Sequence, residues 1–440
     1  MEDLIELAKY ACMTAEKEGA EFVDVVASKS RDISAGIERN SVKHGDANTS
    51  SGISVRVFIR GGMGFTSTTG LDKNEIKEIS GNAVALAKIA QPDPDFVSLP
   101  APASYPAIEG LFDEKIAGMD TGRAIRYLLA NIESAKSVNA DVILNGGIGL
   151  GYSEAAIVNS LGVEGISRDT SISLNVETTI RKGDDVGSFY DFDYARRLSD
   201  FSAEGLGANA AKMALKFLGP SHISGGVMPV VFSPLSSMSI FSAICSNANA
   251  EDVQRNRSYL VGKKGRQIAS ELVTIVDNPL IPGGLSSGPF DGEGFPRKPL
   301  TIIEKGTLKS LLHNSYTSNK VNEPNTGHST RGGISPTNIN PVLGAKTEKE
   351  IIGEVKDGLY VALGSLSPNS ASGDISATLD WVFKIENGEI TYPVKNIMIG
   401  INMLDLLKDI DAVSSDYREE PGTKMPAVRV KYIRVAGGKK

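Results

Sequence analysis

The N-terminal half of the 440-residue chain contains the same order of elements twice, and this repetition constrains the fold more than any other feature. In each copy an amphipathic helix precedes three stretches with strand-like alternation, and an alanine-rich helix follows them. The first copy begins with a helix at 2–18 and ends with one at 72–90, and the second begins at 118–137 and ends at 200–218. Two such units are expected to form antiparallel sheets with helices on one side, which is an α+β arrangement.

A cluster of turn residues at 219–226 separates the last of these helices from a second half that is rich in strands. Tight turns between hairpin strands are expected at Glu304–Gly306 and Glu386–Gly388. A chain of this length exceeds what one hydrophobic core usually serves. The sequence therefore predicts two domains, an N-terminal duplicated α+β domain at 1–220 and a mainly antiparallel β sandwich or barrel-like domain at 221–440.

The composition is that of an ordinary globular protein and argues against several classes. A net charge of −7 and a single basic cluster at Gly262–Arg266 disfavour a general nucleic-acid-binding surface. Cys12 and Cys245 lie in apolar helical patterns and are expected to be buried thiols in a reducing compartment. The N-terminal stretch has no basic leader, and no apolar run approaches a membrane span. We therefore expect a cytoplasmic protein that binds neither nucleic acid nor membrane.

The stretch that follows the turn residues at 219–226 is informative because it lacks side chains that could act in catalysis. A β-branched run at 227–232 predicts a buried strand. Ser233 then offers an N-cap oxygen and Pro234 a preset φ, so a helix is expected to begin here. Up to Glu251 its polar face carries only serines, with neither a histidine nor a carboxylate. Because a serine nucleophile needs a nearby base, the sequence places no catalytic group on this helix.

The C-terminal half contains five informative sequence blocks. They are SYLVGKKGRQIASELVTIVDNP at 258–279, PFDGEGFPRK at 289–298, IIEKGTLKSLLHNSYTSNK at 302–320, TGHSTRGG at 326–333 and IENGEITYPV at 385–394. Taken in order, these blocks resemble the TldD/PmbA family. The TldD branch of that family is a zinc metallopeptidase, and its PmbA branch, also called TldE, is the partner of that peptidase. The resemblance is weaker in the N-terminal half.

In TldD-type members an HExxxH helix precedes the first of these blocks by a fixed distance. Counting back from Ser258 places the two histidines on Phe241 and Ser246 and the glutamate on Ser242. The family's third zinc ligand is a cysteine near the C-terminus, and the segment 416–435 contains no cysteine. The resemblance thus implies a chain without catalytic residues and without a metal site of its own, as in the PmbA/TldE branch.

Several other residues are candidates for a site. His313 and His328 could approach each other across a hairpin and a loop to bind zinc, although isolated histidines usually serve structure. Asp291 and Glu293 match the family's DxEG segment, and His328 lies in the TGH element typical of PmbA/TldE-type chains. These three residues either contact a peptide beside the cleft or belong to a glycine-rich turn. Cys245 has no adjacent base and is expected to be structural.

The resemblance implies a non-catalytic TldE/PmbA-like subunit that pairs with a TldD-like paralogue as a heterodimer, or forms a homodimer. The complex would degrade or process unfolded peptides, with zinc present only in the TldD-like chain. An alternative is a regulatory protein-binding partner without a proteolytic role, as the family's older description as modulators of DNA gyrase suggests. A third reading, an independent hydrolase with an unusual metal site, has no support in the sequence.

Overall fold

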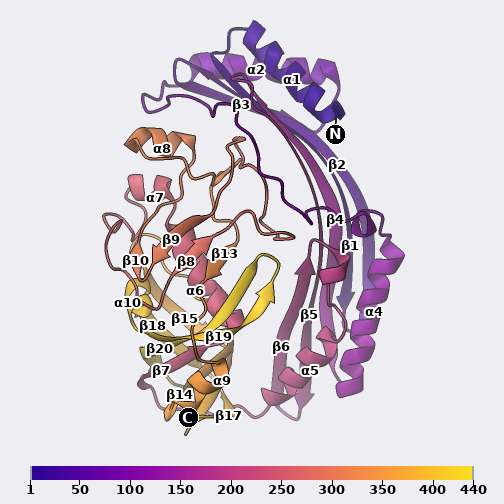
Figure 1. Ribbon diagram of the computed structural model, residues 1–440. Coiled ribbons are helices and arrows are strands. Elements are labelled where there is room, and N and C mark those ends of the chain that lie inside the picture. The colour runs from indigo at the N-terminus through magenta and orange to yellow at the C-terminus, as the bar shows by residue number, and fades with distance from the viewer. Residues whose placement is uncertain (1, 439–440) are drawn as a thin grey trace.

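The molecule has two parts, a long curved sheet backed by helices and a β-rich C-terminal half that lies inside the curve of the sheet (Figure 1). The structure is a computed structural model and describes residues 2–438. It confirms the predicted α+β class. None of the helices that it describes has the length and hydrophobicity needed to cross a membrane.

The strands of the N-terminal half form one antiparallel sheet in the order β3-β2-β1-β4-β5-β6. Each copy of the repeated unit supplies one half of this sheet, and the copies meet where β1 pairs with β4, from Asp24 opposite Asn159 to Ile37 opposite Gly146. The elements are α1 (Glu2–Lys17), β1 (Phe22–Glu38), β2 (Ser41–Ile59), β3 (Gly62–Thr68), α2 (Lys73–Ile89), α3 (Glu114–Ala117), α4 (Thr121–Val138), β4 (Ile143–Asn159), β5 (Glu164–Lys182), β6 (Asp185–Ala195) and α5 (Leu206–Lys216).

The helices cover the outer face of this sheet because alternate strand residues are apolar there. On β1, for example, Val23 and Val25 are fully buried in a core with α1 and α2, whereas Asp24 lies on the opposite face. Helix α5 is shorter than the predicted 200–218 and begins at Leu206. The reason is Gly205, whose φ of 86° is left-handed and cannot continue a helix.

The C-terminal half is built on a curled eight-stranded sheet in the order β15-β18-β20-β7-β14-β16-β17, with β19 paired to β20. The pairs are antiparallel except β7 with β14, which is parallel. A second sheet has the order β10-β9-β8-β13. The strands are β7 (Gly226–Phe232), β8 (Ile275–Asp277), β9 (Leu300–Glu304), β10 (Thr307–Leu308), β11 (Ser329–Thr330), β12 (Gly333–Ile334), β13 (Ile339–Pro341), β14 (Asp357–Leu363), β15 (Asp374–Leu379), β16 (Trp381–Glu386), β17 (Glu389–Val394), β18 (Ile397–Asn402), β19 (Ile410–Glu420) and β20 (Thr423–Ala436).

The two predicted hairpin turns are present between β9 and β10 and between β16 and β17. Both use residues with positive φ, the second through Asn387 at 48° and Gly388 at 83°. The helices of this half are α6 (Pro234–Asn247), α7 (Ala250–Gln254), α8 (Ser315–Val321), α9 (Glu348–Gly353) and α10 (Met403–Lys408).

Candidate functional site

Helix α6 stands where the resemblance places the zinc-binding helix of the TldD branch. Its first turn is capped as predicted, since the Ser233 hydroxyl accepts a hydrogen bond from the Ser236 amide at 3.2 Å and donates one to the Ala362 carbonyl at 2.7 Å. The helix packs on β20 and β14. Phe241 is 1% exposed and belongs to the C-terminal core. Position 241 therefore faces the core.

The other two positions of the expected motif face different surroundings. Ser242 lines a cavity of about 170 Å³ between α6, β6 and the β19–β20 hairpin, whereas Ser246 is exposed. Zinc sites use cysteine, histidine or carboxylate ligands, so a phenylalanine and two serines do not fit this metal. Within residues 2–438 there is also no cluster of three or more His, Cys, Asp or Glu that could hold a metal ion.

Cys245 lies on the same helix and is fully buried in the C-terminal core. Burial, with a smaller contribution from the Asp277 carboxylate, raises the pKa of the Cys245 thiol well above its usual value. A buried, protonated thiol is a poor nucleophile. The structure thus agrees with the interpretation of Cys245 as a small core residue.

The two candidate histidines are buried, and each imidazole has its own carboxylate neighbour. His313 Nε2 lies 3.2 Å from Glu323 Oε2, and His328 Nε2 lies 3.5 Å from Asp277 Oδ1. Nδ1 of His313 lies 3.2 Å from the Thr317 hydroxyl, and Nδ1 of His328 lies 2.9 Å from the Thr326 hydroxyl. The two residues are neighbours, since the His328 amide donates to the His313 carbonyl at 3.4 Å. Their rings nevertheless have separate partners and belong to no group of three or more potential metal ligands within residues 2–438.

Asp291 lies at the centre of the glycine-rich loop before β9 and is 3% exposed. Its Oδ1 accepts hydrogen bonds from the amides of Glu293 at 2.9 Å and Phe295 at 3.0 Å, and its Oδ2 accepts one from the Ser329 amide at 3.0 Å. Burial, followed by the charge of Glu293, raises the pKa of Asp291 to about 6, against the opposing effect of the three amides. Asp291 thus holds the loop to β11.

Glu293 belongs to an ionic network that joins the two parts of the molecule, with buried carboxylates and a partly exposed Arg331. Its Oε2 accepts a hydrogen bond from the Ser315 amide at 3.0 Å, and its Oε1 lies 3.7 Å from Nη2 of Arg56 on β2. Arg56 and Arg331 both bind the carboxylate of Asp24, with Arg56 Nε at 2.8 Å and Arg331 Nη1 at 2.6 Å. Although burial raises the pKa of Asp24, the charges of Arg56 and Arg331 hold it below its usual value.

Sequence reasoning did not find this network, because it joins Asp24 to Arg331, which are 307 residues apart in the chain. The one available signal was Asp24 itself, a carboxylate between valines within a predicted strand. The roles proposed for Asp291, Glu293 and His328 in peptide contact stay predictions. Of the three, Glu293 lines a cavity, whereas Asp291 and His328 are buried and are not among its lining residues.

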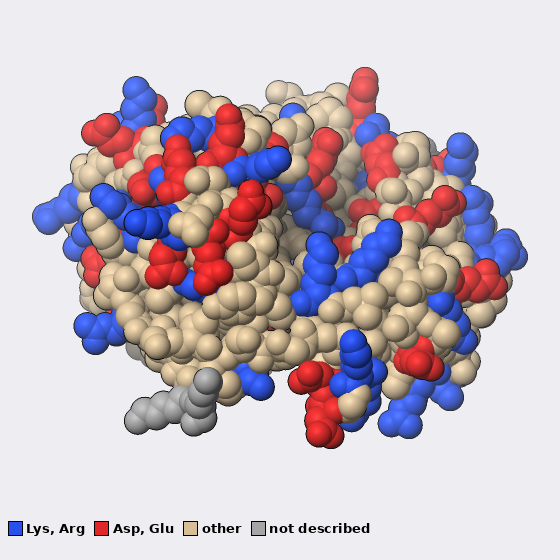
Figure 2. Space-filling model, turned by 90° about the horizontal axis from the view of Figure 1, so that it is seen from below, with Lys and Arg blue, Asp and Glu red and all other residues tan. Residues whose placement is uncertain are grey.

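Three cavities follow one another along the boundary between the long sheet and the C-terminal half, and we call this row the interdomain cleft. The first, of about 170 Å³, contains Ser242. The second, of about 390 Å³, shares part of its lining with the first, and the third, of about 460 Å³, shares Thr330 with the second. Viewed from below, the molecule is hollowed between its two parts, with charged side chains around the hollow (Figure 2). The residues common to the first two cavities are Leu285, Ser286 and Thr337.

The third cavity is lined by both charged and aromatic side chains. Arg56, Glu293 and Arg331 are among its charged lining residues. Phe58 and Phe96 form an aromatic wall, in which their rings stack with centroids 3.9 Å apart, and the Arg56 guanidinium lies 5.6 Å from the centre of the Phe58 ring. A pocket that combines aromatic surface with a few fixed polar groups suits a ligand with apolar side chains and a polar backbone.

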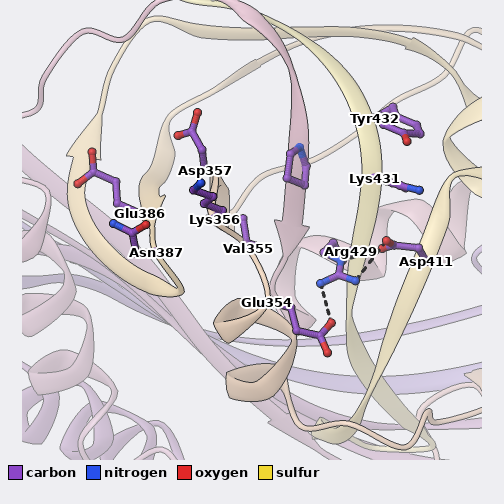
Figure 3. Close-up of a pocket in the computed structure, with 11 residues that line it drawn as sticks. Glu354, Val355, Lys356, Asp357, Glu386, Asn387, Asp411, Arg429, Lys431 and Tyr432 are labelled. Atoms are coloured by element: carbon purple, nitrogen blue, oxygen red, sulfur yellow. Dashed lines mark hydrogen bonds and ion pairs between the residues drawn. The ribbon is translucent and has the colours of Figure 1, made fainter.

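A larger groove, of about 810 Å³, lies on the eight-stranded sheet (Figure 3). Arg429 and Lys431 line it, whereas the alternate residues of β20 belong to the core beneath α6. The groove therefore opens on the face of the sheet opposite α6. Arg429 is already paired with Glu354 at 3.0 Å and Asp411 at 2.8 Å, so its charge is satisfied within the chain. We place the candidate site in the interdomain cleft rather than here.

The raised pKa of Asp291 predicts a pH dependence of stability. The pKa of an aspartate in an unfolded chain is about 3.9. In the folded protein the pKa of Asp291 is about 6, so the folded state holds this proton more tightly. The cost of ionising Asp291 is absent below about pH 4, grows as the pH rises towards 6, and reaches roughly 3 kcal/mol above it. Raising the pH from 4 to 7 should therefore destabilise the natural protein relative to Asp291→Asn, as measured by urea unfolding. The exposed Asp46→Asn is the matched control, and equal pH profiles for the natural protein and both variants would contradict the prediction.

Family models for three consecutive domains match the chain. They are described as PmbA/TldA metallopeptidase domain 1, the PmbA/TldA metallopeptidase central domain and the PmbA/TldA metallopeptidase C-terminal domain. They match residues 23–87, 112–218 and 225–437, respectively.

Similar proteins cover almost the whole chain. The metalloprotease PmbA of Escherichia coli O157:H7 is 27% identical over 436 residues, which cover 96% of this chain and 93% of that protein. The crystal structure of TldE from Thermococcus kodakarensis has a TM-score of 0.91 at 24% identity and covers 98% of this chain and 100% of that chain. A structure from Thermotoga maritima, described as a proposed modulator of a DNA gyrase, has a TM-score of 0.89 at 26% identity, with 98% and 99% covered.

Proposed function

The chain belongs to the PmbA/TldD family of metallopeptidase-related proteins, and we propose that it is a non-catalytic, TldE/PmbA-like subunit of a zinc peptidase complex. In this proposal a TldD-like paralogue carries the metal and the general base, and this chain completes the chamber and holds an unfolded peptide. Self-association through the same surface is compatible with this role. We place the complex in the cytoplasm, without nucleic acid or membrane as a partner.

The observation that carries the proposal is the environment of α6. Amide hydrolysis in this family requires a metal-polarised carbonyl and a general base. Phe241 is packed in the core, Ser242 borders a small cavity and Ser246 is exposed, so this helix presents no ligand and no base. Relatives such as the E. coli protein PmbA are named metalloproteases. For this chain we assign the hydrolytic step to the partner.

The interdomain cleft supports the second half of the proposal, the binding of an extended peptide. Its cavities form a row, which suits a chain more than a compact ligand. The aromatic wall at Phe58 and Phe96 offers a place for an apolar side chain, and the charged side chains in the same cavity offer donors and acceptors for a backbone.

The isolated protein should bind no stoichiometric zinc. The measurement is elemental analysis of protein that was purified without chelators or a metal-affinity tag, with a TldD-like relative as the positive control. Less than about one zinc per ten chains is expected, because the donor set at α6 does not fit the metal. One tightly held zinc per chain would overturn the non-catalytic assignment and direct attention to His313 and His328.

A further inference from the structure

The second cavity of the interdomain cleft brings together three arginines from separate parts of the chain. Arg168 lies on β5, Arg196 directly follows β6, and Arg297 lies in the loop before β9. Each has a buried nitrogen without a hydrogen-bond partner among the described residues, namely Nε of Arg168, Nη1 of Arg196 and Nε of Arg297. Buried donors without partners are uncommon in folded proteins. Three of them around one cavity of about 390 Å³ point to a ligand.

Backbone carbonyls of the glycine-rich loop hold two of these side chains in place. Arg196 is 7% exposed and donates from Nε to the Gly284 carbonyl at 2.8 Å and from Nη2 to the Leu285 carbonyl. Arg297 donates from Nη1 to the Ser286 carbonyl at 3.1 Å. These carbonyls carry no net charge, so they orient both guanidinium groups without neutralising them. Arg196 has in addition one ion-pair partner, Asp169, which lies 3.0 Å from its Nη1. The remaining nitrogen atoms are therefore fixed before a ligand arrives.

Arg168 is held differently, by a ring and by weak ion pairs. Its guanidinium lies 3.4 Å from the centre of the Phe112 ring. Its Nη2 lies 3.5 Å from Glu114, whose side chain is 82% exposed, and its Nε lies 3.7 Å from Glu154. Ion pairs at such distances near solvent contribute little.

The lining of the cavity has an excess of positive charge. Asp169 is its only carboxylate among the described residues, 3.0 Å from Arg196 Nη1 and 42% exposed. Burial lowers the pKa of Arg297, the carboxylates of Asp291 and Asp277 oppose this effect, and repulsion by Arg196 makes the smallest contribution. An anion between the guanidinium groups would give the buried Nε atoms of Arg168 and Arg297 the acceptor that they lack.

We propose that this arginine pocket, formed by Arg168, Arg196 and Arg297, binds a carboxylate of the peptide. The carboxylate is the C-terminal one or that of an Asp or Glu side chain. The guanidinium fork matches a carboxylate with two parallel hydrogen bonds. The proposal rests on the proposed function, because the pocket lies between the cavity of Ser242 and the cavity with the aromatic wall. A peptide bound along the cleft would pass through it.

Short blocked ligands test the pocket without requiring a partner or a long peptide. Binding to the full chain is measured by calorimetry for N-acetyl-glycylglycine and its amide, and for N-acetyl-glutamate amide and N-acetyl-glutamine amide. At least one of the anionic compounds should bind at least about tenfold more tightly than its neutral counterpart, because hydrogen bonds between charged groups are stronger. The first pair reports on a C-terminal carboxylate and the second on a side-chain carboxylate. Inorganic phosphate is titrated as well, to test whether the pocket prefers a phosphate to a carboxylate.

Variants locate the binding. Arg297→Gln should remove the preference for the anionic compound, and the exposed Arg266→Gln, outside the cleft, should leave it unchanged. Arg168→Gln is the second variant, because its more exposed side chain makes misfolding less of a concern. Unfolding temperatures of the three variants show whether each is folded before it is used.

The outcomes separate this proposal from the proposed function. No preference for either anionic compound overturns the carboxylate site, as does a preference that survives in both Arg297→Gln and Arg168→Gln. Phosphate binding that is tenfold tighter than either carboxylate also overturns it. A labelled, neutral, unstructured peptide of twelve residues is titrated in parallel, alone and in the presence of a TldD-like relative. If that peptide fails to bind in both cases while the short carboxylates bind, the peptide-holding function fails and the anion site stands.

Discussion

Replacing Asp24 with asparagine should lower the free energy of unfolding by about 3–5 kcal/mol. Asp24 is 1% exposed and is the shared acceptor of Arg56 and Arg331. Without its charge the two arginines would face each other at the boundary between the long sheet and the C-terminal half, with Glu293 at 3.7 Å from Arg56 as the nearest remaining carboxylate. Removing one member of a buried ion group costs more than the group contributes, and here the cost falls mainly on Arg56, whose side chain is 19% exposed and would lose its nearest partner.

Urea unfolding followed by circular dichroism measures the effect of Asp24→Asn. The matched control is Asp32→Asn, an exposed carboxylate on the same strand, which should change stability by less than about 0.5 kcal/mol. The contribution of Asp24 should be complete at neutral pH and be lost as the pH falls below about 4, since its pKa is lowered in the folded protein. Equal stabilities of Asp24→Asn and Asp32→Asn would contradict this account of the boundary.

The second large effect is expected on restoring the family's motif to α6. The triple variant F241H/S242E/S246H should lose about 3–5 kcal/mol of stability, and most of this loss should come from position 241. Phe241 fills a closed part of the core, so a histidine there leaves a cavity and buries a polar ring. The variant should also fail to hold stoichiometric zinc, because no cysteine occupies the C-terminal segment.

The double variant S242E/S246H is the control for this experiment. Ser242 borders a cavity and Ser246 is exposed to solvent. The free energy of unfolding of this double variant should therefore remain within about 1 kcal/mol of that of the natural protein. Urea unfolding and elemental analysis are measured on both variants. A triple variant with natural stability and one zinc per chain would show that the helix is a dormant metal site.

The sequence was sufficient to predict features that depend on local patterns. The order of elements in the repeated unit follows from the change between helical and strand-like periodicity. The start of α6 follows from Ser233 and Pro234, and the hairpin turns follow from their glycines. The family blocks and the loss of the motif at Phe241 were also visible without a structure.

Features that depend on distant pairings could not be predicted. The joining of the two units into one sheet requires β1 to pair with β4, more than 100 residues away. The arginine pocket draws Arg168 and Arg297 together from the two parts, and in the sequence each resembles an ordinary surface arginine. Helix α5 was predicted too long because helical periodicity does not reveal that Gly205 adopts a left-handed conformation.

The most direct measurement of the central claim is peptide cleavage in a reconstituted mixture. This chain, a TldD-like relative with an intact HExxxH helix, and their equimolar mixture are each incubated with an unfolded, fluorescently labelled peptide. We predict cleavage by the mixture, with loss of activity on chelation or on replacement of the relative's motif glutamate, and no cleavage by this chain alone. A homodimer of this chain would not bear on the result. Chelator-sensitive cleavage by this chain alone, or full activity of the relative without it, would contradict the account.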